Sequence, residues 1–344
     1  MPLTTGLLLL PSQPSGRLAE IAQLAERTGY DYLWLADERF FREVYASLTL
    51  CALRTQRIQL GPCVTDPFSR HAALTAMAVA TLDEISGRRA VLGMGAGVSG
   101  FRELGIAREK PGVAMREAVE VIRKLLAGET VTSKGSVVRI EGAHLDFRPA
   151  RADVPIYIAS QQPVGCRAAG RVADGAIMQG CVAEPLLAFF RDTVAAGARE
   201  TGRDPGQVDL VARINVCVHD DRRTARDLMK PTIVRSLAAQ RPDFFTFRTA
   251  GLEIPPALAK HLEGLTYAYD PQPFQAAAAE VPESFVDAVT LAGPPDEVAA
   301  GVIRLARQGV AQLMIYPLAP DGRIEVVVER FQQEVMPRVR AAGR

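Results

Sequence analysis

Short apolar runs alternate with segments of helical periodicity along almost the whole chain. The run Leu7–Leu10 is followed by Leu18, Ile21 and Ala25, which recur at helical spacing before Gly29. Buried strands that alternate with amphipathic helices are typical of parallel βα units. A glycine just after a helical segment suits the left-handed residue that commonly ends a helix. The alternation therefore predicts strands that are each followed by a helix.

The pattern occurs eight times, and this number decides the predicted fold class. The expected strands are Leu7–Leu10, Tyr30–Ala36, Ile58–Leu60, Ala90–Gly93, Pro155–Ala159, Ala176–Met178, one within Val208–Val218, and Gln312–Tyr316. Later helices are expected over residues 44–54, 184–202, 222–238, 296–308 and 324–342. Eight βα units favour a (βα)8 barrel over an open sheet. We therefore predict an α/β protein, a (βα)8 TIM barrel, with residues 1–344 forming a single domain.

Two segments depart from this rhythm. Residues 130–147 are expected to form a small hairpin, and residues 240–288 lie between the last two expected strands. Long irregular segments in compact domains are usually functional. We predict that residues 240–288 are an insertion that lids the pocket. Its aromatic residues suggest an apolar ligand, but packing of the lid onto the barrel is the favoured interpretation; they are Phe244, Phe245, Phe247, Tyr267 and Tyr269.

Composition narrows the function classes. Lys and Arg number 40 against 39 Asp and Glu, so the net charge is +1 and favours neither nucleic acid nor an anionic membrane as partner. The run Leu7–Leu10 is too short for a signal sequence or a membrane span. The five cysteines form no CxxC and the four histidines show no ligand spacing, so we expect reduced thiols, a cytoplasmic protein and no metal centre.

Candidate chemistry lies where the expected strands end, since active sites of such barrels form at the carboxyl ends of the strands. The second strand ends in Asp37 and Glu38, two carboxylates that suit general acid–base work. The alternative is a solvated acid paired with Arg39 or Arg42. The third strand runs into a stiff loop, Gly61–Pro67, which contains Cys63.

Two further strand ends offer backbone for a ligand. Gly93–Gly97 resembles a dinucleotide fingerprint but has Val98 in the sixth position, so we interpret it as a loop that admits a flat or phosphorylated ligand. Ser160 follows the fifth strand just before a helix. It is interpreted either as part of an anion site at the helix N-terminus or as a plain N-cap serine.

Together these stretches resemble the bacterial-luciferase-like superfamily of flavin- or F420-dependent oxidoreductases. The resemblance rests on YDYLWLADERF, LGPCVTDPFSRH, LTAMAVATLDEISGRRAVLGMGAG, PIYIAS with AGRVADGAIM, and LAGPPDEVA. The second stretch is most similar to the branch containing methylenetetrahydromethanopterin reductase, which uses the deazaflavin coenzyme F420. The resemblance implies a flavin or deazaflavin bound at the carboxyl ends of the strands.

The resemblance also implies roles for individual residues. It implies a non-prolyl cis peptide between Cys63 and Val64, which forms a bulge against the ring. Asp37 matches the family's acid near the reacting edge of the ring, and Glu38 stands where a histidine is frequent. The other cofactor-binding residues implied are Pro62, Thr65, Gly95, Ala96 and Gly97 around the ring, and Ala159, Ser160, Gln161 and Gln162 toward the phosphate or ribityl chain. The family usually has a glycine in the last of these stretches, and this chain has none.

The predicted function is that of an F420-dependent oxidoreductase that transfers a hydride between reduced deazaflavin and a small organic substrate. The first alternative is a luciferase-like monooxygenase whose reduced FMN comes from a partner flavin reductase. A non-catalytic flavin-binding relative is the second, and a barrel enzyme of unrelated chemistry is the third. The family resemblance also implies a homodimer or tetramer.

Overall fold

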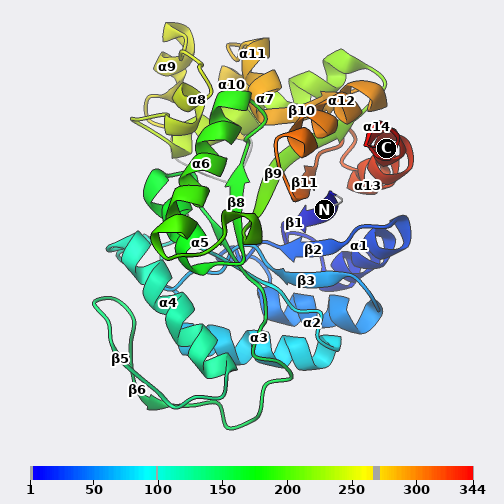
Figure 1. The fold of residues 1–344 in the computed structure, drawn as a ribbon. Helices are drawn as coiled ribbons and strands as arrows, with labels where there is room; N and C mark the ends of the chain where they lie inside the picture. The colour runs from blue at the N-terminus through cyan, green and yellow to red at the C-terminus, as the bar shows by residue number, and fades with distance from the viewer. Residues whose placement is uncertain (1–2, 98–99, 266–271, 344) are drawn as a thin grey trace. The chain divides into compact units, whose positions relative to one another are not determined.

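A computed structural model describes residues 3–97, 100–265 and 272–343 (Figure 1). The chain divides into two compact units. The first unit comprises the described residues of Met1–Leu7, Met178–Asp192 and Leu210–Arg344, and the second comprises Leu8–Ile177 and Thr193–Asp209. The boundaries fall within elements, namely the strands β1 (Thr4–Leu9), β8 (Gly175–Gln179) and β9 (Asp209–Val218) and the helix α6 (Glu184–Glu200).

The second unit alternates parallel strands with helices, as predicted. Its complete strands in the main sheet are β2 (Tyr32–Leu35), β3 (Gln59–Pro62), β4 (Leu92–Gly95) and β7 (Ile156–Ala159). Its helices are α1 (Ser15–Thr28), α2 (Val44–Arg54), α3 (Ala72–Ser86), α4 (Pro111–Leu126), α5 (Pro163–Val172) and the short η1 (Pro205–Gln207). Helices α1 to α5 pack on one another in chain order (Figure 1).

Parallel pairing sets the order of these strand ends. Strand β2 pairs with β3 with Leu35 opposite Pro62, and β4 pairs with β7 with Gly95 opposite Ala159. A further parallel bridge joins Thr65, just past β3, to Met94 of β4. Strand β7 also pairs with the first part of β8. The carboxyl ends of β2, β3, β4 and β7 therefore lie in one row.

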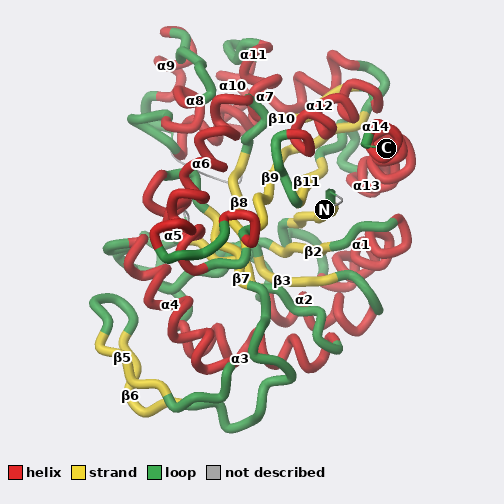
Figure 2. The backbone as a smooth tube through the Cα atoms, in the orientation of Figure 1, coloured by secondary structure: helices red, strands yellow, loops and turns green. Residues whose placement is uncertain are grey.

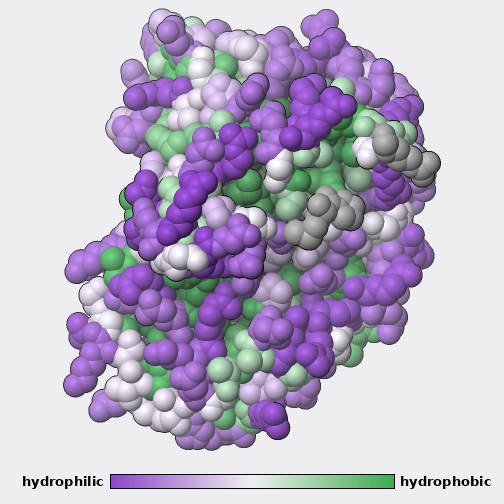
Figure 3. All heavy atoms as spheres, in the orientation of Figure 1, coloured by the Kyte–Doolittle hydropathy of each residue, from purple (hydrophilic) through white to green (hydrophobic). Residues whose placement is uncertain are grey.

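The predicted helix end at Gly29 and the predicted hairpin are confirmed. Helices α1 and α3 end at Gly29 and Gly87 with φ of 101° and 68°, left-handed values that glycine adopts readily. Residues 130–147 contain the antiparallel strands β5 (Val131–Lys134) and β6 (Arg139–Ala143), which form their own two-stranded sheet (Figure 2). Hydrophilic side chains predominate on the face drawn in Figure 3.

The first unit contains the start of the first predicted strand and the last two predicted strands. Strand β11 (Gln312–Pro317) pairs in parallel with β1 on one side and β9 on the other. Strand β1 begins at Thr4 rather than at Leu7, because the Thr5 side chain is buried and its hydroxyl accepts a 2.8 Å hydrogen bond from Gln332. A strand that was not predicted, β10 (Thr290–Gly293), pairs with the end of β9.

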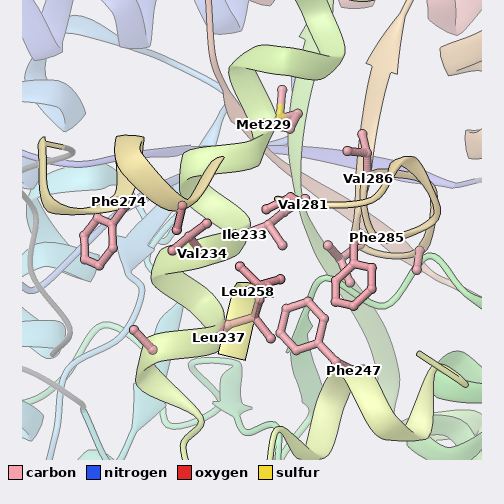
Figure 4. Close-up of a cluster of buried hydrophobic side chains, with 14 of the residues drawn as sticks. Met229, Ile233, Val234, Leu237, Phe247, Leu258, Phe274, Val281, Phe285 and Val286 are labelled. Atoms are coloured by element: carbon pink, nitrogen blue, oxygen red, sulfur yellow. The ribbon is translucent and has the colours of Figure 1, made fainter. Parts of the chain in front are cut away.

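The described residues of the segment 240–288 form a series of helices rather than an irregular loop, which corrects the sequence-based expectation. It forms α8 (Phe245–Thr249), α9 (Pro256–Leu262), α10 (Gln272–Ala278) and α11 (Glu283–Val289). These helices pack with α7 (Arg222–Ala239) around a buried cluster in which the rings of Phe247 and Phe285 stack 5.7 Å apart (Figure 4). Phe247 therefore has a packing role, as the favoured interpretation of the sequence predicted. Tyr267, Tyr269 and Val98 lie outside the described residues.

The expected helix over residues 324–342 is interrupted. The segment consists of α13 (Ile324–Arg330), a π-helical turn η2 (Phe331–Val335) and α14 (Met336–Ala342), and follows α12 (Pro295–Arg307) and β11. Pro337 stands in the first turn of α14. Because proline has no N–H to donate into the preceding turn, the regular α-helical bonding changes there.

Candidate functional site

The row of strand ends in the second unit brings the predicted site residues together. Asp37 and Glu38 follow β2, and Cys63, Val64 and Thr65 follow β3. Strand β4 ends at Gly95 and is followed by Ala96 and Gly97, and strand β7 ends at Ala159 and is followed by Ser160, Gln161 and Gln162. Pro62, Thr65 and Gly95 are buried, Gln162 is exposed, and the remaining members of the set are half-buried.

Asp37 is held by side chains that come from other loops. Its Oδ2 accepts a 2.6 Å hydrogen bond from the Thr65 hydroxyl and lies 3.9 Å from Nε of Arg70. The Asp37 side chain is 21% exposed, so it is largely shielded from solvent. The interpretation of Asp37 as a solvated acid paired with Arg39 or Arg42 is therefore wrong. Arg42 donates instead to the carbonyl oxygens of Pro11 and Ser12.

Burial raises the pKa of Asp37 above its ordinary value. The Thr65 hydroxyl and the positive charges of Arg70 and Arg39 lower the pKa, and the negative charge of Glu43 raises it, but the effect of burial is the largest. A buried carboxyl with a raised pKa keeps its proton closer to neutral pH. Such a group is suited to hold or release a proton during a reaction.

The peptide bond between Cys63 and Val64 is cis, as the family resemblance implied. The cis peptide lies against β4, where glycines allow close approach. A Cβ atom at Gly93 would lie 2.4 Å from the carbonyl oxygen of Pro62, and one at Gly95 would lie 2.6 Å from Cγ2 of Val64. Side chains at these two positions would therefore collide with the segment around the cis bond.

A buried ion pair ties the loop after β2 to the loop after β3, and its arginine also contacts a ring in the loop after β4. The guanidinium of Arg39 pairs with the buried carboxylate of Asp66 and lies 4.2 Å from the centre of the Phe101 ring. Arg108 lies 5.2 Å from the same ring and also donates to the carbonyl oxygen of Gly97. The contacts of both arginines with Phe101 thus hold the end of the glycine-rich stretch Gly93–Gly97 beside the loop after β3.

Ser160 is not the N-cap of α5, because the helix begins at Pro163 and Gln162 occupies the N-cap position. The Ser160 hydroxyl instead accepts a 3.1 Å hydrogen bond from the backbone N–H of Gln162. A Cβ atom at Gly165 would lie 2.2 Å from the Ser160 Oγ, so glycine is required in the first turn of the helix. The plain N-cap interpretation is therefore wrong, and the anion site stays a prediction.

Sequence reasoning missed Arg70 and Tyr45, which lie against Asp37. Arg70 precedes His71, the N-cap of α3, whose Nδ1 accepts from the N–H of Ala73. The Arg70 guanidinium carbon lies 4.9 Å from the centre of the Tyr45 ring, on α2. Nothing in the local pattern distinguishes Arg70 from other arginines, since its contacts come from residues more than twenty positions away.

Among the residues that the structure describes, no group of three or more His, Cys, Asp or Glu side chains is placed to hold a metal ion. Across those same residues, every helix is too short or too polar to cross a membrane.

The chain is similar to several known oxidoreductases over nearly its whole length. A 5,10-methylenetetrahydromethanopterin reductase of Methanolobus tindarius is 35% identical over 322 residues, which cover 93% of this chain and 96% of that protein. An F420-dependent glucose-6-phosphate dehydrogenase of Nakamurella multipartita is 30% identical, covering 94% and 92%. The solved structure of the coenzyme F420 dependent tetrahydromethanopterin reductase from Methanopyrus kandleri matches with a TM-score of 0.87 and 29% identity, covering 98% and 100%.

Fold and similarity together define an α/β barrel oxidoreductase, which confirms the predicted fold class and the prediction of an enzyme. The model of the luciferase-like monooxygenase family matches residues 3–312. The chain belongs to this family, and the predicted resemblance to the branch containing methylenetetrahydromethanopterin reductase is confirmed.

Proposed function

We propose that this protein is an F420-dependent oxidoreductase that transfers a hydride between reduced deazaflavin and a small organic substrate. One observation carries the proposal. The shielded carboxyl of Asp37, bonded to Thr65, lies in the same row of strand ends as the Cys63–Val64 cis peptide and the glycines of β4. The F420-dependent names of relatives that cover more than nine-tenths of the chain support the choice of cofactor.

The residues in this row suit a flat ring with a phosphorylated tail. Gly95, Ala96 and Gly97 carry at most a methyl group, and Cys63 and Val64 are half-buried beside them. These residues would border the ring, while Ser160 to Gln162 offer hydroxyl, amide and backbone N–H groups to the tail. When bound, the deazaflavin supplies the hydride donor or acceptor.

The chain's own part in the chemistry is to position the reactants and to handle a proton. Asp37 would hold the proton at its carboxyl oxygens, and the upward shift of its pKa favours this role. Glu38 lies next to it, half-buried, and would assist as a second acid or base. Thr65 would fix the orientation of the Asp37 carboxyl through its hydroxyl.

Replacing Asp37 tests this assignment. In Asp37→Asn we expect kcat to fall at least ~100-fold, the usual contribution of a positioned acid–base group, while the Kd for F420 stays within about twofold. The assay uses reduced and oxidised F420 with a methylene-tetrahydropterin and with glucose 6-phosphate, the substrate classes in the names of the relatives. Asp192→Asn, at an exposed ion pair, is the control. Normal turnover in Asp37→Asn would exclude the proposed role.

We also propose that the protein forms a homodimer or tetramer through helices α2 and α3. These neighbouring helices leave four large apolar side chains more than a third exposed, namely Leu53, Leu74, Met77 and Ile85. Burying them against a second copy would remove apolar surface from water. Sedimentation analysis should show an oligomer that Met77→Glu converts to monomer. A monomeric wild type would contradict the proposal.

A further inference from the structure

Asp37 and Arg70 are joined to the first turn of α2 by a chain of contacts that the family resemblance does not imply. Arg70 comes from the loop before α3, and its Nε lies 3.9 Å from Oδ2 of Asp37. Its Nη2 donates a 2.8 Å hydrogen bond to Oε1 of Glu43. The guanidinium therefore bridges two carboxylates, one at the site and one at the start of a helix.

Glu43 is held in place by the helix that it caps. Its Oε2 accepts a 2.7 Å hydrogen bond from the backbone N–H of Ala46, which makes it the N-cap of α2. A capping carboxylate loses rotamer freedom because it satisfies a helix N–H. Glu43 is thus a fixed anchor for the far end of the Arg70 guanidinium.

Tyr45, two residues further along α2, supports the flat face of the guanidinium. The Arg70 carbon lies 4.9 Å from the ring centre, within the range of a cation–π contact. The Tyr45 side chain is only 8% exposed. Within the described part of the chain, the Arg70 Nε is buried and meets no hydrogen-bond partner. The position of Arg70 therefore follows from Glu43 and from the ring, while its Nε–H remains directed to the neighbourhood of Asp37.

We propose that Arg70 is a positioning residue that sets the charge state of Asp37, with Glu43 as its anchor and the Tyr45 ring as its support. The link to catalysis rests on the proposed function, but the electrostatic relation between the two side chains does not. The first turn of α2 would thereby tune the proton-handling group of the site without touching substrate.

The charged and titratable groups that face Asp37 determine the direction of the effect. Arg70 and Arg39 favour the ionised carboxylate, Glu43 opposes it, and the negative charge of Asp37 in turn raises the pKa of Tyr45, whose burial has the larger effect. Arg39 also forms a buried pair with Asp66, whereas the Nε of Arg70 lies 3.9 Å from the Asp37 carboxylate. Loss of the Arg70 charge should therefore leave Asp37 harder to ionise.

The test measures the pKa of Asp37 directly, by carbon-13 NMR of protein labelled at the aspartate carboxyl carbon. The resonance is assigned by its absence in Asp37→Asn. In Arg70→Gln we expect the pKa of Asp37 to rise by about one unit, the lower end for loss of an opposite charge at this distance. Arg70→Lys retains the positive charge and should keep the pKa of Asp37 close to its wild-type value. Arg171→Gln, which breaks an ion pair with Glu200 at the far end of α5, should leave the pKa of Asp37 unchanged.

Two variants at Tyr45 separate the support that its ring gives to Arg70 from the effect of the Arg70 charge. Tyr45→Leu removes the ring and should raise the pKa of Asp37 by a smaller amount than Arg70→Gln does. Tyr45→Phe keeps the ring and should leave that pKa unchanged. An unchanged Asp37 pKa in Arg70→Gln would overturn the inference, whatever the activity.

Steady-state pH profiles of the same variants separate this inference from the proposed function. If the limb of the pH–rate profile and the NMR-measured pKa of Asp37 both move to higher pH in Arg70→Gln, the inference and the proposed function are both supported. If the measured pKa moves but the limb of the pH–rate profile does not, the inference stands and Asp37 is not the proton-handling group.

Discussion

The hydroxyl of Thr65 donates a 2.6 Å hydrogen bond to Oδ2 of Asp37, and the backbone on both sides of Thr65 is itself bonded. The Thr65 N–H donates to the carbonyl oxygen of Gly93, and the N–H of Gly95 donates to the carbonyl oxygen of Thr65. Thr65 is completely buried. The orientation of the Asp37 carboxyl is therefore set by the pairing of β3 with β4 and not by solvent.

Thr65→Val should raise the pKa of Asp37 and reduce turnover. The substitution keeps the shape of the side chain but removes a donor that favours the carboxylate, and a hydrogen bond to a charged group contributes about 1.5–3 kcal/mol. We expect kcat to fall about tenfold. The limb of the pH–rate profile that is assigned to Asp37 should move to higher pH. Thr65→Ser retains the hydroxyl and should remain close to wild type. Equal losses in the Val and Ser variants would show that the methyl group matters instead.

Asp37→Asn should make the protein more stable at neutral pH. Burial gives Asp37 a higher pKa in the folded chain than its ordinary 3.8, so the folded state binds more protons between these two values. Stability of the wild type therefore decreases as the pH rises through this window, and the loss persists above it. Urea unfolding should show a larger free energy of unfolding for Asp37→Asn at pH 7 and a smaller difference near pH 4. A gain that is the same at both pH values would contradict the assignment to ionisation.

Gly93→Ala should destabilise the row of strand ends. The new Cβ would lie 2.4 Å from the Pro62 carbonyl oxygen and 3.2 Å from the ring of Trp34, so the backbone must move. Overpacking of this kind costs about 1–3 kcal/mol. Trp34 is the one tryptophan of the sequence, and its fluorescence reports the shift. Gly16→Ala, where a Cβ would meet nothing within 4 Å in α1, should be neutral or slightly stabilising.

Asp66→Asn should destabilise the second unit more than a surface change does. The Asp66 carboxylate accepts from the N–H groups of Phe68 and Ser69, both at 2.8 Å, and pairs with the buried guanidinium of Arg39. Breaking one partner of a buried pair costs about 3–5 kcal/mol, because the other charge remains without compensation. Thermal unfolding measures the loss. Asp192→Asn at an exposed pair should change stability by less than ~0.5 kcal/mol, and a similar small change in Asp66→Asn would contradict this account.

The fold was predictable where hydrophobic periodicity and glycine positions agree. The left-handed ends at Gly29 and Gly87 follow from local sequence, because each helix must satisfy its last carbonyl groups nearby. The insertion was not predictable, since its short helices bury Phe247 and Phe285 through contacts with α7 that local sequence does not contain. Tertiary packing determines helix formation there more than propensity does.

The same division holds for the candidate site. Asp37, Cys63 and Val64 were predictable because strand ends and the family resemblance locate them. Arg70 was not, because its relation to Asp37 depends on how α2 and the loop before α3 approach each other in space. The contact of Arg39 with Asp66 rather than with Asp37 has the same origin.

The central claim, an F420-dependent hydride transfer, is tested most directly by anaerobic titration of the purified protein with reduced F420 and with reduced FMN, followed by addition of oxygen. A deazaflavin has carbon where a flavin forms its oxygen adduct, so reduced F420 does not activate oxygen. The account predicts saturable binding of F420 and oxidation of bound reduced F420 only by substrate, without oxygen uptake. Tighter binding of FMN, with oxygen consumption that depends on the protein, would contradict it.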